Sequence, residues 1–270
     1  MRGMYTAGVL DVFLDHEIKV DGVIGISAGA VFGVNFLSRQ RGRVIRYNKR
    51  FNSDKSYMGL RPLLRTGNIV NTEYAYHVVP GELDKFDDET YRASGIPFYA
   101  GVTSLETGRA EYIKIDSVFE QMDALRASAS MPFVSRPVVW KGQRYLDGDI
   151  ADSVPYQTMF DMGYDRLIVV LTRERSYQKK PISPAMIRLC YGRHREFADA
   201  LMRRHEKYNS GVRELEALER QGRVFVIAPS EPITIGRVEK DPGKLQQVYE
   251  LGVKDGTEAV GRMRQVYADL

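Results

Sequence analysis

Val23-Ile24-Gly25-Ile26-Ser27-Ala28-Gly29-Ala30 is the stretch that decides the fold. Residues 20–24 predict a short buried strand, and the apolar run from Gly29 through Leu37 predicts a helix. The G-x-S-x-G sequence at 25–29 therefore lies between a strand and a helix, where such a sequence forms a sharp turn that exposes its serine. We expect Ser27 to be held in a strained conformation, with glycines at 25 and 29 because the neighbouring backbone leaves no room for a side chain.

Outward from this turn, short apolar strands alternate with helices. The pattern predicts strands near 96–103, 109–115, 143–147, 166–171 and 223–227, and helices near 4–15, 117–130, 155–162, 193–220 and 242–267. Alternation of this kind favours an α/β fold with a mostly parallel sheet covered by helices on both faces. With no repeat and no linker-like break, we expect one domain over residues 1–270.

Composition excludes several classes of protein. The chain is 43% hydrophobic, with 39 basic and 35 acidic residues and a formal net charge of +4. A single cysteine, Cys190, rules out an intramolecular disulfide and a cysteine-based zinc site. The longest apolar stretch, 23–37, is interrupted and too short to span a bilayer, and no secretory signal is recognisable. We therefore expect a cytoplasmic protein, either free in the cytoplasm or bound peripherally at the inner membrane surface.

Basic residues concentrate between Arg39 and Arg65, where nine lysines and arginines accompany one acid, Asp54. One interpretation is a solvated helix and loop. The other is a surface that docks an anionic membrane or ligand. No nucleic-acid-binding motif accompanies the charge, so we expect no nucleic acid partner.

A nucleophilic serine needs a base. The four histidines, His16, His77, His194 and His205, all lie outside turn or glycine-rich contexts, although the sequence leaves His194 and His205 open as bases. The alternative is Asp147 in Asp147-Gly148-Asp149, which follows a short predicted strand. Asp-Gly is also an ordinary turn signal, so the local sequence by itself does not choose between these readings.

Four blocks together resemble the patatin-like phospholipase family in its bacterial form. They are Arg2-Gly3 with Tyr5-Thr6-Ala7-Gly8-Val9-Leu10, Gly25–Gly29, Ala127-Ser128-Ala129-Ser130-Met131-Pro132, and Tyr145-Leu146-Asp147-Gly148. The later segment from Ala228 to Arg237 is also similar to the bacterial branch. The resemblance covers essentially the whole chain. It implies a three-layer α/β/α sandwich, lipid acyl hydrolase activity, a Ser–Asp dyad, and neither a metal nor a cofactor.

Carried onto this sequence, the resemblance makes Ser27 the nucleophile and Asp147 the general base, with Gly148 and Asp149 in the proton-acceptor loop. The oxyanion hole and elbow would involve Arg2, Gly3, Gly25, Ala28 and Gly29, with the Ala28 N–H as a donor. Asp149 departs from the small residue usual in the family. Its carboxylate either raises the pKa of the base or points to solvent.

The second departure is at the start of the chain. The family's oxyanion loop reads Gly-Gly-Gly-x-Arg/Lys-Gly, and only Arg2-Gly3 of it follows Met1. The first strand and the glycines would precede residue 1, whether through a late start site, a shortened chain or a real loss. We therefore carry two hypotheses: a serine hydrolase of phospholipids or other acyl esters, and a catalytically impaired relative that binds acyl lipids or anionic headgroups.

Overall fold

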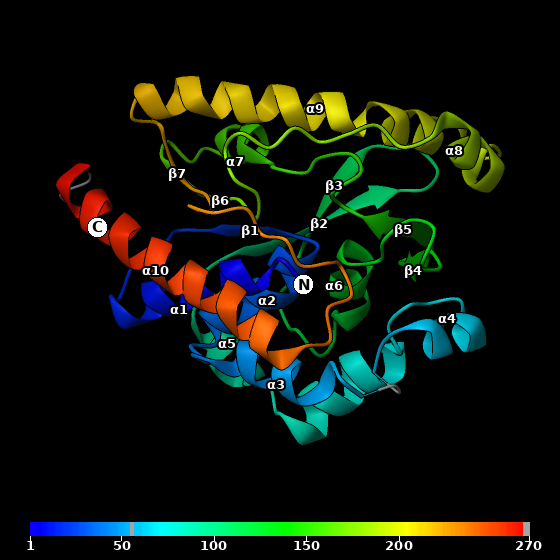
Figure 1. Ribbon diagram of the computed structural model, residues 1–270, viewed down its shortest axis with the longest axis horizontal. Helices are drawn as coiled ribbons and strands as arrows, with labels where there is room; N and C mark the ends of the chain where they lie inside the picture. Colours follow the sequence, from blue (N-terminus) through cyan, green and yellow to red (C-terminus); the bar gives the residue numbers. More distant parts are fainter. Residues whose placement is uncertain (55–56, 267–270) are drawn as a thin grey trace.

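The computed structural model describes residues 1–54 and 57–266, so Lys55 of the basic run lies outside the described residues. Strands form two sheets at the centre of the molecule (Figure 1). The strands are β1 (Val23–Ile26), β2 (Phe98–Ser104), β3 (Ala110–Lys114), β4 (Val138–Trp140), β5 (Gln143–Asp147), β6 (Leu167–Val170) and β7 (Val224–Ile227). The larger sheet runs in the order β1-β2-β5-β4, with β3 also paired to β2, and β6 and β7 form the smaller sheet.

The pairing is more mixed than the mostly parallel sheet expected from the sequence. β1–β2 and β6–β7 are parallel, whereas β2–β3, β2–β5 and β4–β5 are antiparallel. The short connections explain the difference, because β2–β3 and β4–β5 are hairpins, and a parallel pair needs a crossover of a dozen or more residues.

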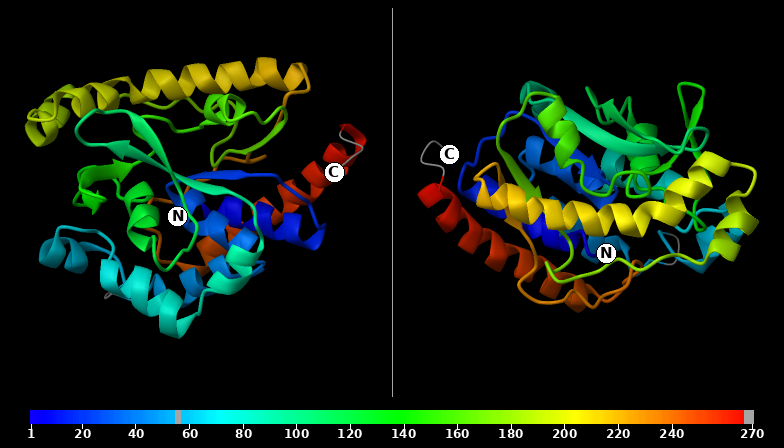
Figure 2. Two further views of the ribbon diagram at one scale, coloured as in Figure 1. Left: turned by 180° about the vertical axis from the view of Figure 1, so that it is seen from behind. Right: turned by 90° about the horizontal axis from the view of Figure 1, so that it is seen from above.

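Helices cover both faces of the strands (Figures 1 and 2). They are α1 (Met4–Asp15), α2 (Ala28–Leu37), α3 (Arg43–Phe51), α4 (Leu60–Thr66), the π-helix η1 (Tyr74–Leu83), α5 (Asp88–Ala93), α6 (Met122–Ser128), α7 (Tyr156–Asp161), α8 (Pro184–Tyr191), α9 (Arg195–Arg220) and α10 (Pro242–Val266). α7 and α9 lie on one side, while α1, α2, α3 and α10 lie on the other. The three-layer α/β/α class expected from the sequence is confirmed.

The largest core lies on the side of α1, α2 and α10. Tyr5 and Phe98 are fully buried there. Glycines let two of these helices approach closely: a Cβ at Gly8 would collide with the Tyr249 carbonyl, and one at Gly252 with the Tyr5 carbonyl. α10 is thereby fixed against α1, the helix that leads to β1 and the Ser27 turn.

α9 buries its apolar stripe on the opposite face. Phe197 and Leu201 pack with Leu146 of β5, and Leu215 packs with the β6–β7 sheet. This amphipathic helix was expected from its apolar spacing at 193–220. Because α9 crosses the end of β5, its polar side chains can reach the segment that follows Asp147.

Candidate active site

Ser27 lies at the turn between β1 and α2 in a strained backbone conformation. Its φ is 55° and its ψ is −119°, values that a residue with a side chain rarely adopts. A serine at a helix N-cap ordinarily accepts a hydrogen bond from the first turn of the helix. The Ser27 hydroxyl makes no such bond. The turn instead directs the hydroxyl away from the helix and toward β5.

The two glycines of the turn have different roles, which corrects part of the sequence expectation. A Cβ on Gly25 would lie 2.5 Å from the Ala30 Cα and from the Gly29 carbonyl oxygen, so glycine is required where α2 turns back against β1. A Cβ on Gly29 would meet no atom within 4 Å. The expectation that the backbone crowds Gly29 is wrong, because Gly29 faces open space.

The Ser27 hydroxyl donates a hydrogen bond directly to Asp147. The distance from Ser27 Oγ to Asp147 Oδ2 is 2.8 Å. Asp147 is the last residue of β5, and its other carboxylate oxygen accepts from the Asp149 N–H at 2.9 Å. Among the described residues no hydrogen bond links Ser27 to a histidine. The pair is therefore a serine and an aspartate in direct contact.

Burial raises the pKa of Asp147 to about 7, and the nearby charge of Asp149 adds to the effect. The hydrogen bonds from Asp149 and Ser27 and the charge of Arg204 oppose this increase. A carboxyl group whose pKa lies near neutral pH can both accept and release a proton there, which is what an effective general base requires.

Asp149 is held in an ion-pair cluster. Its carboxylate pairs with Lys179 at 2.7 Å and with Arg204 of α9. Burial opposes ionisation of Asp149, but the two cations outweigh it and keep its pKa below the ordinary value. Lys179 itself is largely buried, and burial lowers its pKa to about 8. The alternative that Asp149 points to solvent is therefore wrong.

Ser128 fixes the turn from the side of α6. Its hydroxyl accepts a hydrogen bond from the Ser27 N–H at 2.9 Å and donates one to the Gly101 carbonyl of β2 at 2.6 Å. Two residues further on, the Ser130 carbonyl accepts from the Asp147 N–H. The Ala127–Pro132 block thus ties the serine and the aspartate to one support, a role that the sequence analysis left unassigned.

Gly148 and Gly3 allow close approaches around this pair. A Cβ on Gly148 would collide with the Gly101 carbonyl, so the segment after Asp147 lies directly against β2. A Cβ on Gly3 would lie 2.6 Å from the Ala28 Cβ. The start of α1, where Gly3 is the N-cap, therefore lies beside the start of α2.

Two helix N-termini consequently meet at Ser27. Neither α1 nor α2 has an acidic residue in its first turn, so neither positive end of a helix dipole is neutralised by its own side chains. The N–H groups in the first turn of a helix have no intrahelical acceptor. This region is suited to stabilise negative charge beside Ala28.

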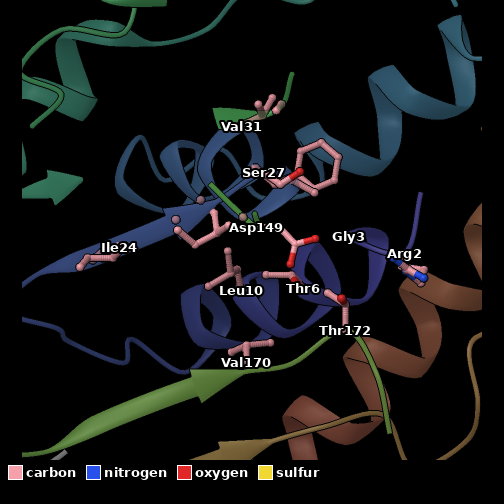
Figure 3. A pocket seen from close by; sticks show the side chains of 18 of the residues that line it. Arg2, Gly3, Thr6, Leu10, Ile24, Ser27, Val31, Asp149, Val170 and Thr172 are labelled. Carbon is pink, nitrogen blue, oxygen red and sulfur yellow. The ribbon is translucent and has the colours of Figure 1, made fainter. Parts of the chain in front are cut away.

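A cavity of about 1410 Å³ contains Ser27, Asp147 and Asp149 in its wall. Figure 3 shows Ser27, Asp149, Gly3 and Arg2 around this space. Apolar residues from α1, α2, β1 and β6 make up much of the rest: Leu10, Val31, Ile24 and Val170 are examples. An apolar space of this kind beside a polar pair suits a substrate with an acyl chain.

Arg2 belongs to the basic part of the cavity wall. Burial lowers its pKa, and repulsion from Arg173 and Arg237 lowers it further. These two arginines, like Arg2, line the cavity. Within the described ranges, no group of three His, Cys, Asp or Glu side chains is placed to hold a metal ion.

The structure thus brings together all the residues that the family resemblance assigned to the site: Ser27, Asp147, Gly25, Ala28, Gly29, Gly148, Asp149, Arg2 and Gly3. His194 and His205, left open as bases, do not line this cavity. It adds Ser128, Lys179 and Arg204. Ser128 lies within the Ala127–Pro132 block, so the run of small residues in that block was the available signal. Lys179 and Arg204 gave none, because they reach Asp149 only through tertiary packing. Arg204 lies on α9, and Lys179 lies in the segment between β6 and α8, where Asn209 of α9 holds its backbone.

The model of the patatin-like phospholipases matches residues 1–160. The chain belongs to this family. A second model, a domain of unknown function (DUF6363), matches residues 194–268, which contain all of α9 and all of α10. The expectation of a single domain over 1–270 stays a prediction.

One curated relative of this patatin-like protein is the uncharacterised protein YjjU of Escherichia coli (strain K12). The two are 27% identical over 175 residues, which are 63% of this chain and 49% of YjjU. The chain therefore spans about half the length of this relative. Within the described residues, no helix is both long and apolar enough to cross a membrane.

Proposed function

We propose that this protein is a serine hydrolase of lipid acyl esters, of the phospholipase A or esterase type, that acts through a Ser27–Asp147 dyad. The 2.8 Å hydrogen bond from Ser27 Oγ to Asp147 Oδ2 carries the proposal. Family membership supports the lipid acyl class of substrate, and the large, mainly apolar cavity beside the dyad supports it independently.

In the first half of the reaction Asp147 accepts the hydroxyl proton as Ser27 Oγ attacks the ester carbonyl carbon. The carbonyl π electrons move to oxygen and form the tetrahedral oxyanion. This intermediate collapses with cleavage of the bond to the alcohol, and the alkoxide leaves with the proton from Asp147. The products of this step are a free alcohol and an acyl ester on Ser27.

In the second half Asp147 accepts a proton from water, which attacks the acyl carbon of the ester. Collapse releases the carboxylic acid, and the proton returns to Ser27 Oγ. The N–H of Ala28, with the converging N-termini of α1 and α2, stabilises the oxyanion in both halves. The raised pKa of Asp147 matches this alternation between base and acid near neutral pH.

The experiment compares the wild type with Ser27→Ala and Asp147→Asn on p-nitrophenyl acyl esters and phospholipid vesicles. We expect Ser27→Ala to remove turnover and Asp147→Asn to lower kcat about a hundredfold to ten-thousandfold, the usual contribution of a general base. Ser176→Ala and Asp199→Asn, both at exposed positions, are the matched controls.

A fluorophosphonate probe gives a second readout, because it reacts only with an activated serine. Mass spectrometry should locate the adduct on Ser27 in the wild type and find none on it in Asp147→Asn. Equal hydrolysis by all of the variants would refute the proposal. An unlabelled Ser27 together with no hydrolysis would favour the alternative, a protein that binds acyl lipids without cleaving them.

A further inference from the structure

Exposed apolar side chains gather at one end of the molecule. Leu60 and Leu64 of α4 are 75% and 86% exposed, Val139 of β4 is 60% exposed, and Leu189 of α8 is 86% exposed. Both Figure 1 and Figure 2 show α4, β4 and α8 at the same end. Large apolar side chains exposed together mark an interaction surface more often than isolated ones do.

Direct contacts join these three elements into one surface. After α4, Ile69 N–H donates to the Val134 carbonyl at 2.8 Å, and Asn68 Oδ1 accepts from Arg136 N–H at 2.8 Å. On the other side, Phe133 N–H donates to the Tyr191 hydroxyl of α8 at 3.0 Å. The segment before β4 therefore bridges α4 and α8.

The same segments are free of acidic residues. No aspartate or glutamate occurs in 57–72, 124–146 or 175–195. Ten of their basic residues are exposed. Four of these are Arg144, which pairs with Glu106, Arg175, which pairs with Glu219, and Lys180 and Arg195. The other six are Arg61, Arg65, Arg136, Lys141, Arg188 and Arg193. None of these six forms a salt bridge with a described residue. We call this surface, with Leu60, Leu64, Val139 and Leu189, the α4–α8 face.

The cavity extends to the segments that carry this face. Met58 and Val70, which pair on either side of α4, line the cavity, as do Phe133 before β4 and Ile182 before α8. A lipid held at the α4–α8 face is therefore next to the wall of the cavity that contains Ser27.

We infer that the α4–α8 face docks on the surface of an anionic phospholipid bilayer. Leucines and valine enter the boundary between headgroups and acyl chains, and the surrounding arginines and lysine bind the headgroup phosphates. This inference rests on the proposed function, because docking on a bilayer serves to present lipid esters to Ser27. The binding itself is a separate property of the surface.

Charge favours a bilayer over a second copy of the chain. A twofold dimer brings the same patch of both subunits together, so basic residues would face basic residues across it. An anionic membrane surface complements the charge instead. The basic run at 39–65 contributes Arg61 and Arg65 to this face, whereas Arg43 is buried and Arg41 is paired with Asp15. The interpretation of the run as a uniformly solvated helix and loop is wrong for Arg43, and the docking interpretation is proposed here only for Arg61 and Arg65.

Vesicle sedimentation tests the inference, with Ser27→Ala used throughout so that hydrolysis does not alter the lipid. We expect binding to vesicles of phosphatidylcholine and phosphatidylglycerol at low ionic strength. Binding should weaken at high salt and be much weaker to phosphatidylcholine alone. Leu64→Ser with Leu189→Ser should lower the partition coefficient at least about tenfold.

Arg65→Gln with Arg188→Gln should lower binding about fivefold for each charge removed. The matched controls are Met162→Ser and Arg92→Gln, which replace an exposed methionine and an exposed arginine outside this face. Circular dichroism checks that each variant is folded. Equal binding by the face variants and the controls would overturn the inference, as would no binding to anionic vesicles.

Light scattering tests whether the α4–α8 face binds a second copy of the chain instead of a bilayer. A dimer that dissociates in the Leu64→Ser, Leu189→Ser variant, together with no vesicle binding, would make this face a contact between copies and overturn the inference. Failure of the docking inference is distinguishable from failure of the proposed function. Hydrolysis of soluble p-nitrophenyl esters without vesicle binding refutes only the docking, and salt-sensitive vesicle binding without hydrolysis supports the docking while the dyad proposal fails.

Discussion

Replacing Asp149 by asparagine should move the pH dependence of hydrolysis to lower pH. The pKa of Asp147 is raised first by burial and then by the charge of Asp149. A general base works when it is deprotonated, so activity should rise with pH through about 7 in the wild type. Without the Asp149 charge, Asp147 loses its proton more easily and the rise begins at lower pH.

The scale of this effect follows from Coulomb's law for two like charges a few ångströms apart. Two like charges roughly 6 Å apart at an effective dielectric constant of ~20 repel by about 3 kcal/mol, which corresponds to about 2 pK units. Lys179 and Arg204 already offset part of the Asp149 charge. We therefore expect a net decrease of about 1 unit in the pH midpoint.

The assay measures kcat/KM for a soluble acyl ester from about pH 5 to about pH 9, with Asp199→Asn as the matched control. Arg204→Gln should shift the midpoint in the opposite direction, because the Arg204 charge lowers the pKa of Asp147. Asp149→Asn leaves Lys179 and Arg204 without their acidic partner, which is destabilising. The opposite shift expected for Arg204→Gln therefore tests the same electrostatic argument independently of whether Asp149→Asn folds. Coincident profiles for the wild type and both variants would refute the electrostatic reasoning.

Three further predictions concern the support of the site. Ser128→Ala leaves the Ser27 N–H and the Gly101 carbonyl without their shared partner, so it should lower both activity and the free energy of unfolding, the latter by about 1–3 kcal/mol in urea denaturation. Gly25→Ala should be destabilising by about 1–3 kcal/mol, whereas Gly29→Ala, which meets open space, should leave stability unchanged or raise it by up to about 1 kcal/mol in the same experiment. Arg43→Met removes a buried guanidinium that pairs with Asp84, and thermal and urea denaturation should show a loss of about 3 kcal/mol or more. A loss as small as that of an exposed arginine variant such as Arg92→Gln would show that this pair is not needed for the fold.

Short-range patterns account for what could be predicted of the fold. The apolar spacing at 4–15 and 193–220 corresponds closely to α1 and α9, and the run at 166–171 contains β6. The helices α3, α4, α5 and α8 and the π-helix η1 were not separately predicted, because they are short or strongly basic. Their positions depend on tertiary contacts such as the pair between Arg46 and Asp84 at 2.8 Å.

Only the parts of the candidate site that lie within sequence motifs could be predicted. Ser27 was singled out by a local signal, the turn between a strand and a helix. The Asp-Gly at 147–148 is also an ordinary turn signal, so Asp147 was chosen over the histidines only through the family resemblance. Their direct hydrogen bond depends on β2, which pairs with both β1 and β5 and so brings together residues 120 positions apart. No local sequence pattern predicts that β2 pairs with both β1 and β5.

The sequence by itself determined the α/β class and the turn at Ser27, because these depend on the order and spacing of nearby residues. It also determined the family, through four short blocks in a fixed order, and the choice of Asp147 as the base followed only from that resemblance. Only the tertiary structure decided the mixed sheet, the ion pairs of Asp149 with Lys179 and Arg204, the open side of Gly29 and the α4–α8 face. These features arise where segments distant in the chain meet, so charge, burial and exposure there are properties of the packing.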